Sequence, residues 1–241
     1  MCYTVLNRVF IDITTKFGVL ILLGFYNYTV ILTYLSLISG VIGIMAAATG
    51  RSLLVSVVCL MLSGFFDMFD GKVARMRTKS TVDERRFGIQ LDSLADIVCF
   101  CVLPAVMGCR YGLNNYFFFV IMALYVVAGL IRLAYFNVCE ENRSAKEGGM
   151  RASYDGLPVT TAAIIFPLFY CVSLLLNKYC TAATISYLYC GLLVAVGFAF
   201  LFNKIKIRKA KGVMFYIVGL FGMVELAIVL VIYILKLKKF I

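Results

Sequence analysis

The sequence predicts an all-α integral membrane protein. Of its 241 residues, 63% are hydrophobic, whereas soluble globular chains are roughly 45 to 50% apolar. The hydrophobic residues form runs of about the 20 residues that a helix needs to cross a bilayer. Short clusters of Lys and Arg separate these runs, as is typical of the loops between membrane helices. The net charge of +11 therefore indicates contact with anionic lipid, and no nucleic-acid partner is expected.

The chain divides into three predicted parts. Residues 1–27 carry Arg8, Asp12 and Lys16 next to a short apolar stretch, which predicts an interfacial amphipathic helix. Residues 28–203 are predicted to form the main transmembrane domain. Residues 204–241 are predicted to add a basic loop and an extra C-terminal span.

Polar interruptions define the first three spans. Span one is predicted over residues 28–48 and ends before the tight turn Gly50-Arg51. Span two is predicted from residue 52 to residue 74, and a polar segment over residues 75–86 follows it. Span three is predicted over residues 87–109, where Pro104 predicts a kink.

The remaining spans follow the same pattern. Span four is predicted over residues 115–138, and the longest polar connection follows over residues 139–156. Span five is predicted over residues 158–177, because Pro158 suits a first helical position. Two further spans are predicted over residues 182–202 and 213–235.

The distribution of positive charge predicts the orientation of the spans. Most Lys and Arg residues lie in the N-terminal segment and in the connections after spans two, four and six. These segments share one side of the membrane, and Lys- and Arg-rich loops are usually cytoplasmic. We therefore expect a multi-pass protein whose basic connections face the cytoplasm, in the cell membrane if the source is prokaryotic.

Four aspartates lie at the predicted cytoplasmic ends of spans two and three. Asp67 and Asp70 are three residues apart, and Asp92 and Asp96 are four apart, so each pair shares one helix face. The connection between these spans makes them antiparallel neighbours, so the two faces can meet. A carboxylate within a membrane helix costs on the order of 3 kcal/mol. Four of them together require a positively charged partner.

Divalent cations would supply that charge. The chain contains no histidine, and ligand sets made only of oxygen favour Mg²⁺, Mn²⁺ or Ca²⁺. Two such ions suit substitution at phosphorus, because they can hold both the attacking and the leaving oxygen. The small residues Gly71, Ala74 and Gly88 would leave room for a ligand, and Arg75 adds positive charge for a phosphate.

Two alternatives to a metal-dependent enzyme stay open. In the first, the aspartates pair with Arg75, Arg132 or Lys72, or are solvated at the interface. In the second, the protein is a transporter or channel whose aspartates bind permeating cations; such a protein is expected to carry acidic residues near the midplane of several spans. The nine cysteines lack CxxC spacing and are interpreted as small hydrophobic fillers.

The spacing of the aspartates resembles the signature of the CDP-alcohol phosphatidyltransferase family. It reads Asp67-x2-Asp70-Gly71-x2-Ala74-Arg75, then Gly88-x3-Asp92-x3-Asp96, and all eight fixed positions are present. Twelve residues separate Arg75 from Gly88, four more than in the usual signature, and we expect them to lengthen a loop. The resemblance implies a catalytic six-helix transmembrane core of this family type within residues 28–203.

Within the family, the flanking residues are most similar to those of phosphatidylserine synthases. The similarity lies in Leu91–Asp96, Phe100, Pro104-Ala105, Arg132–Asn137 and Gly156–Pro158. It implies that the phosphatidyl group of CDP-diacylglycerol passes to the hydroxyl of L-serine and that CMP is released. The alternatives are another acceptor, namely glycerol phosphate, inositol or inositol phosphate, or an ether-lipid donor.

The resemblance also implies a role for individual residues. Asp67, Asp70 and Asp92 would hold two divalent metals, while Asp96 would complete the second metal site and act as the base toward serine. The pocket for CDP and its phosphates would be lined by Asp67, Gly71, Ala74, Arg75 and Gly88. Contacts to serine or phosphate are expected from Arg132, Arg143 and Arg151, unless Arg132 forms a structural pair and the other two are solvated. The implied partners are CDP-diacylglycerol, L-serine, CMP and membrane lipids, and a homodimer is compatible with the sequence.

Overall fold

The computed structural model describes residues 30–76, 81–146, 153–155, 157–202 and 206–208, together with isolated positions within 222–231. Within these residues the fold is helical apart from two three-residue strands. The predicted interfacial helix, residues 1–27, lies outside the described residues. The predicted last span lies almost wholly outside them, so both elements remain predictions.

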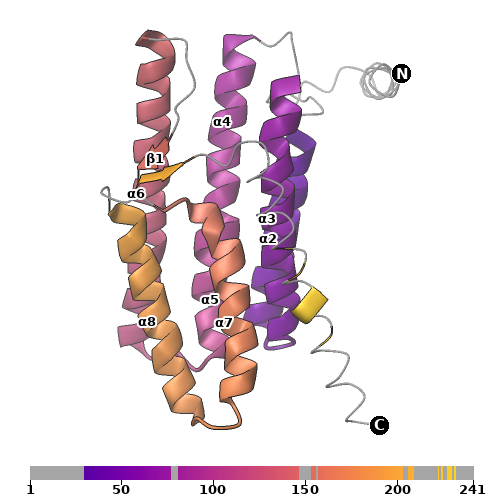
Figure 1. The fold of residues 1–241 in the computed structure, drawn as a ribbon, viewed down its shortest axis with the longest axis vertical. Helices are drawn as coiled ribbons and strands as arrows, with labels where there is room; N and C mark the ends of the chain where they lie inside the picture. The colour runs from indigo at the N-terminus through magenta and orange to yellow at the C-terminus, as the bar shows by residue number, and fades with distance from the viewer. Residues whose placement is uncertain are drawn as a thin grey trace.

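The described helices form a bundle around a central column. In chain order, the elements are α2 (Ile31–Ala48), α3 (Leu53–Met76), α4 (Val82–Asp96), the π-helix η2 (Ile97–Val102), α5 (Leu103–Arg110), α6 (Tyr116–Lys146), β1 (Ser153–Asp155), the 3-10 helix η3 (Val159–Thr161), α7 (Ala162–Leu176), α8 (Ala182–Leu201) and β2 (Lys206–Arg208). Figure 1 shows the long helices running roughly parallel, with α4 and α5 stacked in one column. Among the described residues, six helices are long and apolar enough to cross a membrane, the continuous helix from Val82 to Arg110 counting as one. The predicted α-helical membrane fold is confirmed.

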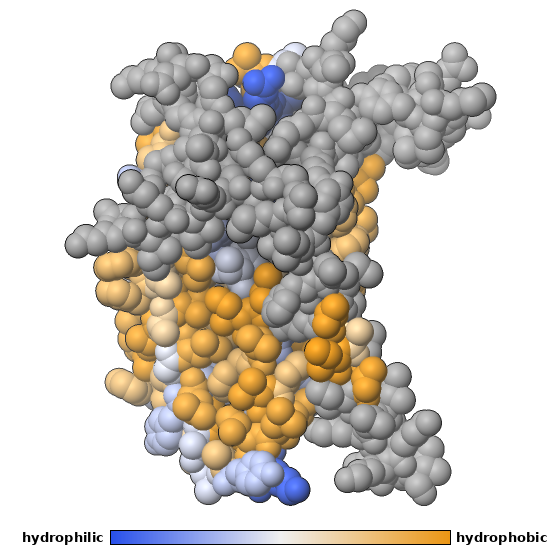
Figure 2. All heavy atoms as spheres, in the orientation of Figure 1, coloured by the Kyte–Doolittle hydropathy of each residue, from blue (hydrophilic) through white to orange (hydrophobic). Residues whose placement is uncertain are grey.

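The outer surface of the bundle is apolar. Figure 2 shows hydrophobic side chains over the middle of the visible face and hydrophilic ones at its lower end. On α6, Phe117 is 71% exposed and Leu124 is 61% exposed. Soluble monomers rarely carry large contiguous apolar patches, so this surface fits contact with acyl chains.

Helices α2 and α3 pack along a seam of small residues. Ser36 Oγ donates a hydrogen bond to the Ser63 carbonyl at 3.1 Å, and Ser63 Oγ donates to the Ser36 carbonyl at 2.9 Å. Ser39 Oγ donates to the Cys59 carbonyl at 2.9 Å. Such bonds between membrane helices contribute on average about 0.6 kcal/mol each. The seam fixes the rotation of α3 about its axis, and so fixes the face on which its aspartates lie.

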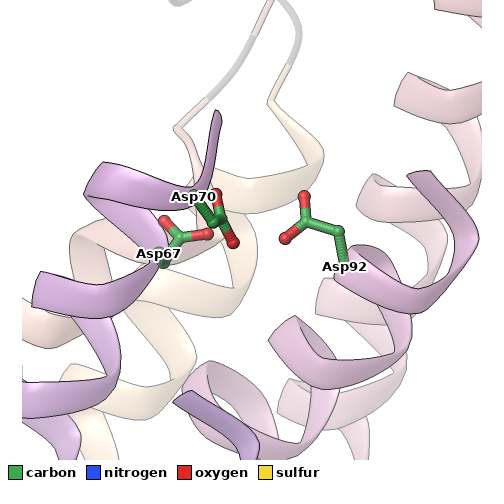
Figure 3. Close-up of side chains that lie close together, drawn as sticks. All are labelled: Asp67, Asp70 and Asp92. Atoms are coloured by element: carbon green, nitrogen blue, oxygen red, sulfur yellow. The ribbon is translucent and has the colours of Figure 1, made fainter. Parts of the chain in front are cut away.

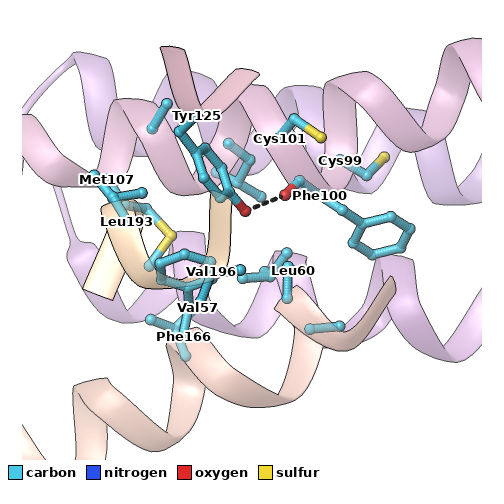
Figure 4. Close-up of a cluster of buried hydrophobic side chains, with 14 of the residues drawn as sticks. Val57, Leu60, Cys99, Phe100, Cys101, Met107, Tyr125, Phe166, Leu193 and Val196 are labelled. Atoms are coloured by element: carbon cyan, nitrogen blue, oxygen red, sulfur yellow. Dashed lines mark hydrogen bonds between the residues drawn. The ribbon is translucent and has the colours of Figure 1, made fainter. Parts of the chain in front are cut away.

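The core of the bundle surrounds η2 and α5. Phe100 of η2, Met107 of α5 and Phe166 of α7 are completely buried and lie in one cluster (Figure 4). The eight cysteines in the described part of the chain are all free, and Cys99 and Cys101 are completely buried. These positions agree with the interpretation of cysteine as a small hydrophobic filler.

The polar segment predicted over residues 75–86 is mostly helical. Helix α3 continues to Met76, and α4 begins at Val82 instead of near residue 87. Thr81 and Glu84 form a capping box: the Glu84 N–H donates to Thr81 Oγ1 at 3.2 Å, and the Thr81 N–H donates to Glu84 Oε2 at 2.9 Å. Six of the twelve residues between Arg75 and Gly88, 82–87, therefore belong to α4. Residues 77–80 lie outside the described residues, so the expectation that the four extra residues lengthen a loop stays a prediction.

The connection predicted over residues 139–156 is also shorter than expected. Helix α6 continues to Lys146, because Glu, Arg, Ala and Lys in this stretch are good helix formers. At this end Arg86 of α4 and Glu141 of α6 form an exposed ion pair at 3.2 Å. Strands β1 and β2 pair antiparallel, with Ser153 opposite Arg208, which joins the α6–α7 connection to the segment after α8.

Two prolines mark irregular points in the helices. Pro104, which predicted a kink, lies directly after η2, in the first turn of α5 and within the continuous helix from Val82 to Arg110. Pro158, predicted at the first position of a helix, precedes η3, and α7 follows only from Ala162. The irregularity near Pro104 is therefore a π-helical turn, which the sequence analysis did not predict.

Candidate metal centre

Three aspartate side chains converge between α3 and α4. Asp67 and Asp70 project from α3 toward Asp92 on α4 (Figure 3). One carboxylate oxygen of each residue lies within 4.8 Å of the other two. Oxygens on opposite sides of one divalent cation are roughly 4 to 5 Å apart, because metal–oxygen distances are about 2.0 to 2.6 Å. The spacing and the all-carboxylate ligand set therefore fit a Mg²⁺, Mn²⁺ or Ca²⁺ ion.

Asp96 lies beside this cluster. It is one turn further along α4 than Asp92, and it is buried, with 8% of its surface exposed. Its side chain is within hydrogen-bonding reach of Asp67, and Asp92 is within reach of Asp70. The structure thus brings together all four aspartates that the sequence analysis singled out.

The electrostatics of the cluster favour a bound cation. Two ionised carboxylates about 5 Å apart repel by about 3 kcal/mol at an effective dielectric constant of about 20. Burial of Asp70 and Asp96 limits screening by water. A divalent cation between the oxygens replaces this repulsion with attraction.

Polar residues that the sequence analysis missed support the aspartates. Thr33 of α2 is buried, and its Oγ1 donates to Asp70 Oδ2 at 3.4 Å. Ser93 follows Asp92 on α4 and accepts a hydrogen bond from Asn137 Nδ2 of α6 at 2.8 Å. No spacing rule could identify Thr33, because it precedes Asp70 by 37 residues on another helix.

Open space surrounds Gly88. Among the described residues, no heavy atom outside its local backbone lies within 4 Å of the position that a Cβ would occupy, so the packing of this part of the chain does not require glycine here. This agrees with the expectation that Gly88 leaves room for a ligand. The backbone of α3 runs through Gly71, Ala74 and Arg75, but the side-chain environment of these residues lies outside the described part of the structure.

Arg132 makes a structural contact at the start of the α7 segment. It is 7% exposed, and its Nε donates to the Leu157 carbonyl at 2.5 Å. The Leu157 N–H in turn donates to the Ala199 carbonyl of α8 at 3.4 Å. Arg132 therefore ties α6 to the residues before α7, a role that the sequence analysis did not consider. The side chain of Arg143 and the whole of Arg151 lie outside the described residues, so their substrate contacts remain predictions.

Comparison with known protein families shows which family shares this arrangement of aspartates. The profile of the CDP-alcohol phosphatidyltransferase family matches residues 26–202. The chain belongs to this family. The matched region contains all four aspartates and the three helices that surround them, so the resemblance based on the aspartate spacing is confirmed.

Three curated relatives show which members of the family are similar. A CDP-diacylglycerol–serine O-phosphatidyltransferase of Saccharomyces cerevisiae is 38% identical over 115 residues, covering 47% of this chain and 40% of the relative. The archaetidylserine synthase of Methanothermobacter thermautotrophicus is 32% identical over 141 residues, covering 58% of this chain and 56% of the relative. A CDP-diacylglycerol–serine O-phosphatidyltransferase of Helicobacter pylori is 35% identical over 122 residues, covering 50% of this chain and 46% of the relative. The chain spans about half the length of these relatives.

Proposed function

We propose that this protein is a phosphatidylserine synthase, which transfers the phosphatidyl group of CDP-diacylglycerol to the hydroxyl of L-serine and releases CMP. The observation that carries the proposal is the convergence of Asp67, Asp70, Asp92 and Asp96 from two adjacent helices. The names of the three relatives all contain serine, which favours serine over glycerol phosphate, inositol or inositol phosphate as the acceptor.

Two divalent cations, Mg²⁺ or Mn²⁺, fit the chemistry of the cluster, and Ca²⁺ could occupy the same sites. Asp67, Asp70 and Asp92 would hold them, and Asp96 would complete the second site. When bound, the ions neutralise the diphosphate of the donor and stabilise negative charge on the attacking and leaving oxygens. The oxygen spacing of at most 4.8 Å between Asp67, Asp70 and Asp92 supports the first of these sites.

Asp96 acts as the base in this proposal. Its buried carboxylate accepts the proton of the serine hydroxyl while the serine oxygen forms a bond to the phosphorus of the phosphatidyl group. The bond from that phosphorus to the CMP oxygen breaks, and CMP leaves with the bonding electrons. A carboxylate base agrees with a chain that contains no histidine.

The substrates would be held by the residues around the aspartates. The open space beside Gly88 supports a nucleotide pocket, which Gly71, Ala74 and Arg75 would extend along α3. Arg132, Arg143 and Arg151 are proposed to contact serine or phosphate. For Arg132 this role would use guanidinium nitrogens other than the Nε that bonds Leu157.

The reaction is proposed to occur at the cytoplasmic face of the membrane. The basic connections on the same side as the aspartates support this orientation. There, serine arrives from water and CMP leaves into it, while the acyl chains of the donor stay in the bilayer. Acidic residues at the ends of two consecutive spans suit this arrangement better than an ion path through the midplane.

The proposal is tested by product analysis with purified protein. With CDP-diacylglycerol, Mn²⁺ and L-serine, we expect CMP release together with phosphatidylserine, and neither product when serine or metal is left out. Glycerol 3-phosphate, inositol and inositol phosphate are tested in parallel, as is an ether-linked donor, because one relative is an archaetidylserine synthase. A product with another acceptor only would reassign the substrate. No CMP release with any acceptor would refute the transferase and favour a cation transporter.

A further inference from the structure

The π-helix η2 begins at the residue after Asp96. Within it, the Leu103 N–H donates to the Val98 carbonyl, five residues earlier, whereas an α-helix joins residues four apart. The wide turn therefore places one extra residue between the aspartates of α4 and the buried helix α5. Each residue of an α-helix turns by about 100°. The wide turn thus changes the direction of Asp92 and Asp96 by about that angle relative to α5.

Neighbouring helices enclose the wide turn from two sides. A Cβ added to Gly40 of α2 would lie 2.5 Å from Cys99 Sγ, and a Cβ added to Gly129 of α6 would overlap Cys101 Sγ. The two thiols therefore fill the spaces that these glycines leave. This packing fixes where η2 sits between α2 and α6, but contacts of this kind carry no hydrogen-bonding direction.

Tyr125 of α6 adds a directional contact. Its Oη donates to the Phe100 carbonyl at 2.9 Å (Figure 4). In an α-helix this carbonyl would accept from residue 104, but Pro104 has no N–H. Tyr125 is itself 2% exposed, and its ring lies 5.8 Å from that of Phe166 and 5.6 Å from that of Phe200, centroid to centroid. The hydroxyl is therefore held in place by aromatic side chains of α7 and α8.

We propose that Tyr125 is a positioning residue for the aspartates of α4. By holding the Phe100 carbonyl, it keeps the wide turn directly after Asp96, where Asp92 and Asp96 project toward α3. A wide turn can move along a helix, and each residue that it passes rotates by about 100°. If it passed Asp96, the carboxylate would turn away from Asp67. This inference rests on the proposed function, because it concerns the direction of residues that would hold the metals.

The test compares Tyr125→Phe with a matched control, Tyr189→Phe. Tyr189 of α8 is also completely buried, and its Oη donates to the Pro104 carbonyl at 2.7 Å, beyond the wide turn. Each variant loses one buried hydroxyl and keeps its ring. Two quantities are measured on the full chain in detergent: Mn²⁺ binding by electron paramagnetic resonance without substrate, and amide hydrogen exchange of residues 96–103 by mass spectrometry.

The expected result separates the two variants. Tyr125→Phe should raise the dissociation constant of Mn²⁺ about tenfold, whereas Tyr189→Phe should change it less than about twofold. Tyr125→Phe should also accelerate amide exchange in residues 96–103 more than the control does. The inference is overturned if Tyr125→Phe behaves as wild type, or if both variants change these two quantities equally.

Amide exchange also distinguishes this inference from the proposed function. If the wild-type protein bound no Mn²⁺, the proposed metal centre would fail. The exchange of residues 96–103 would still decide the part played by Tyr125: faster exchange only in Tyr125→Phe supports it, and equal exchange in all three proteins overturns it.

Discussion

Substitution of Asp96 by asparagine tests the proposed base. Asparagine has the same shape but cannot accept a proton from the serine hydroxyl. General base catalysis contributes typically about 10² to 10⁴ in rate, or about 3 to 5 kcal/mol of activation free energy. Asp96 is buried, so bulk water cannot readily replace it. We therefore expect turnover to fall by about 10²- to 10⁴-fold.

The same substitution should not destabilise the metal-free protein. Asp96 lies beside Asp67, and two ionised carboxylates at about 5 Å repel by up to about 3 kcal/mol. An amide removes this repulsion and can still form hydrogen bonds. The melting temperature of metal-free Asp96→Asn should therefore equal or exceed that of the wild type. A melting temperature in this range would exclude unfolding as the reason for lost turnover.

The assay measures CMP release at saturating serine and donor, together with equilibrium binding of CDP-diacylglycerol. Asp83→Asn is the matched control, because Asp83 lies exposed in the first turn of the same helix and should leave turnover unchanged. Asp96→Asn should bind the donor nearly as tightly as wild type. Turnover above about a tenth of the wild-type rate would refute a catalytic base at this position.

Four further predictions follow from the site and its surroundings. Chelation with EDTA should abolish CMP release and added Mg²⁺ should restore it; activity that persists in EDTA would count against a metal centre. Thr33→Val removes the donor to Asp70 and should weaken Mn²⁺ binding by about five- to tenfold. Thr33→Ser keeps a hydroxyl and should bind Mn²⁺ nearly as the wild type does. Equal Mn²⁺ binding by the two variants would show that the hydroxyl of Thr33 does not support the metal centre. Gly40→Ala forces a methyl group against a buried thiol and should lower the free energy of unfolding by about 1 to 3 kcal/mol, measured by thermal melting; an unchanged melting temperature would contradict tight packing there. Arg86→Ala breaks an exposed ion pair with Glu141 and should change that free energy by less than about 1 kcal/mol; a larger loss would show that the pair is shielded from solvent.

Sequence reasoning succeeded where a pattern is local. Six of the predicted spans correspond to helices of the structure, because the length of an apolar run and the helical period are properties of consecutive residues. The four aspartates were found by the same means, since residues three or four apart share a helix face. Helix ends were less well predicted. Thr81 and Glu84 have the spacing of a capping box in the sequence, but the high charge of this segment suggested a loop.

Contacts between segments far apart in the chain could not be predicted from local sequence patterns. Thr33 reaches Asp70 only because serine hydroxyls of α2 and α3 bond to carbonyls of the facing helix and set the rotation of both. Arg132 was expected to meet an aspartate or a substrate, yet its Nε bonds the Leu157 carbonyl, a group that every residue type provides. A backbone acceptor leaves no signal in the sequence.

The sequence by itself determined that this protein is a helical membrane protein with a family signature of four aspartates, because hydrophobicity, charge and helical spacing are written in consecutive residues. The tertiary structure alone decided where those aspartates point. The direction of Asp67 and Asp70 depends on the serine hydroxyls between α2 and α3. The direction of Asp92 and Asp96 depends on a wide helical turn after Asp96, on thiols packed against glycines of two other helices, and on the hydroxyl of Tyr125. These contacts join residues far apart in the chain, and their effect appears only once the helices are packed together.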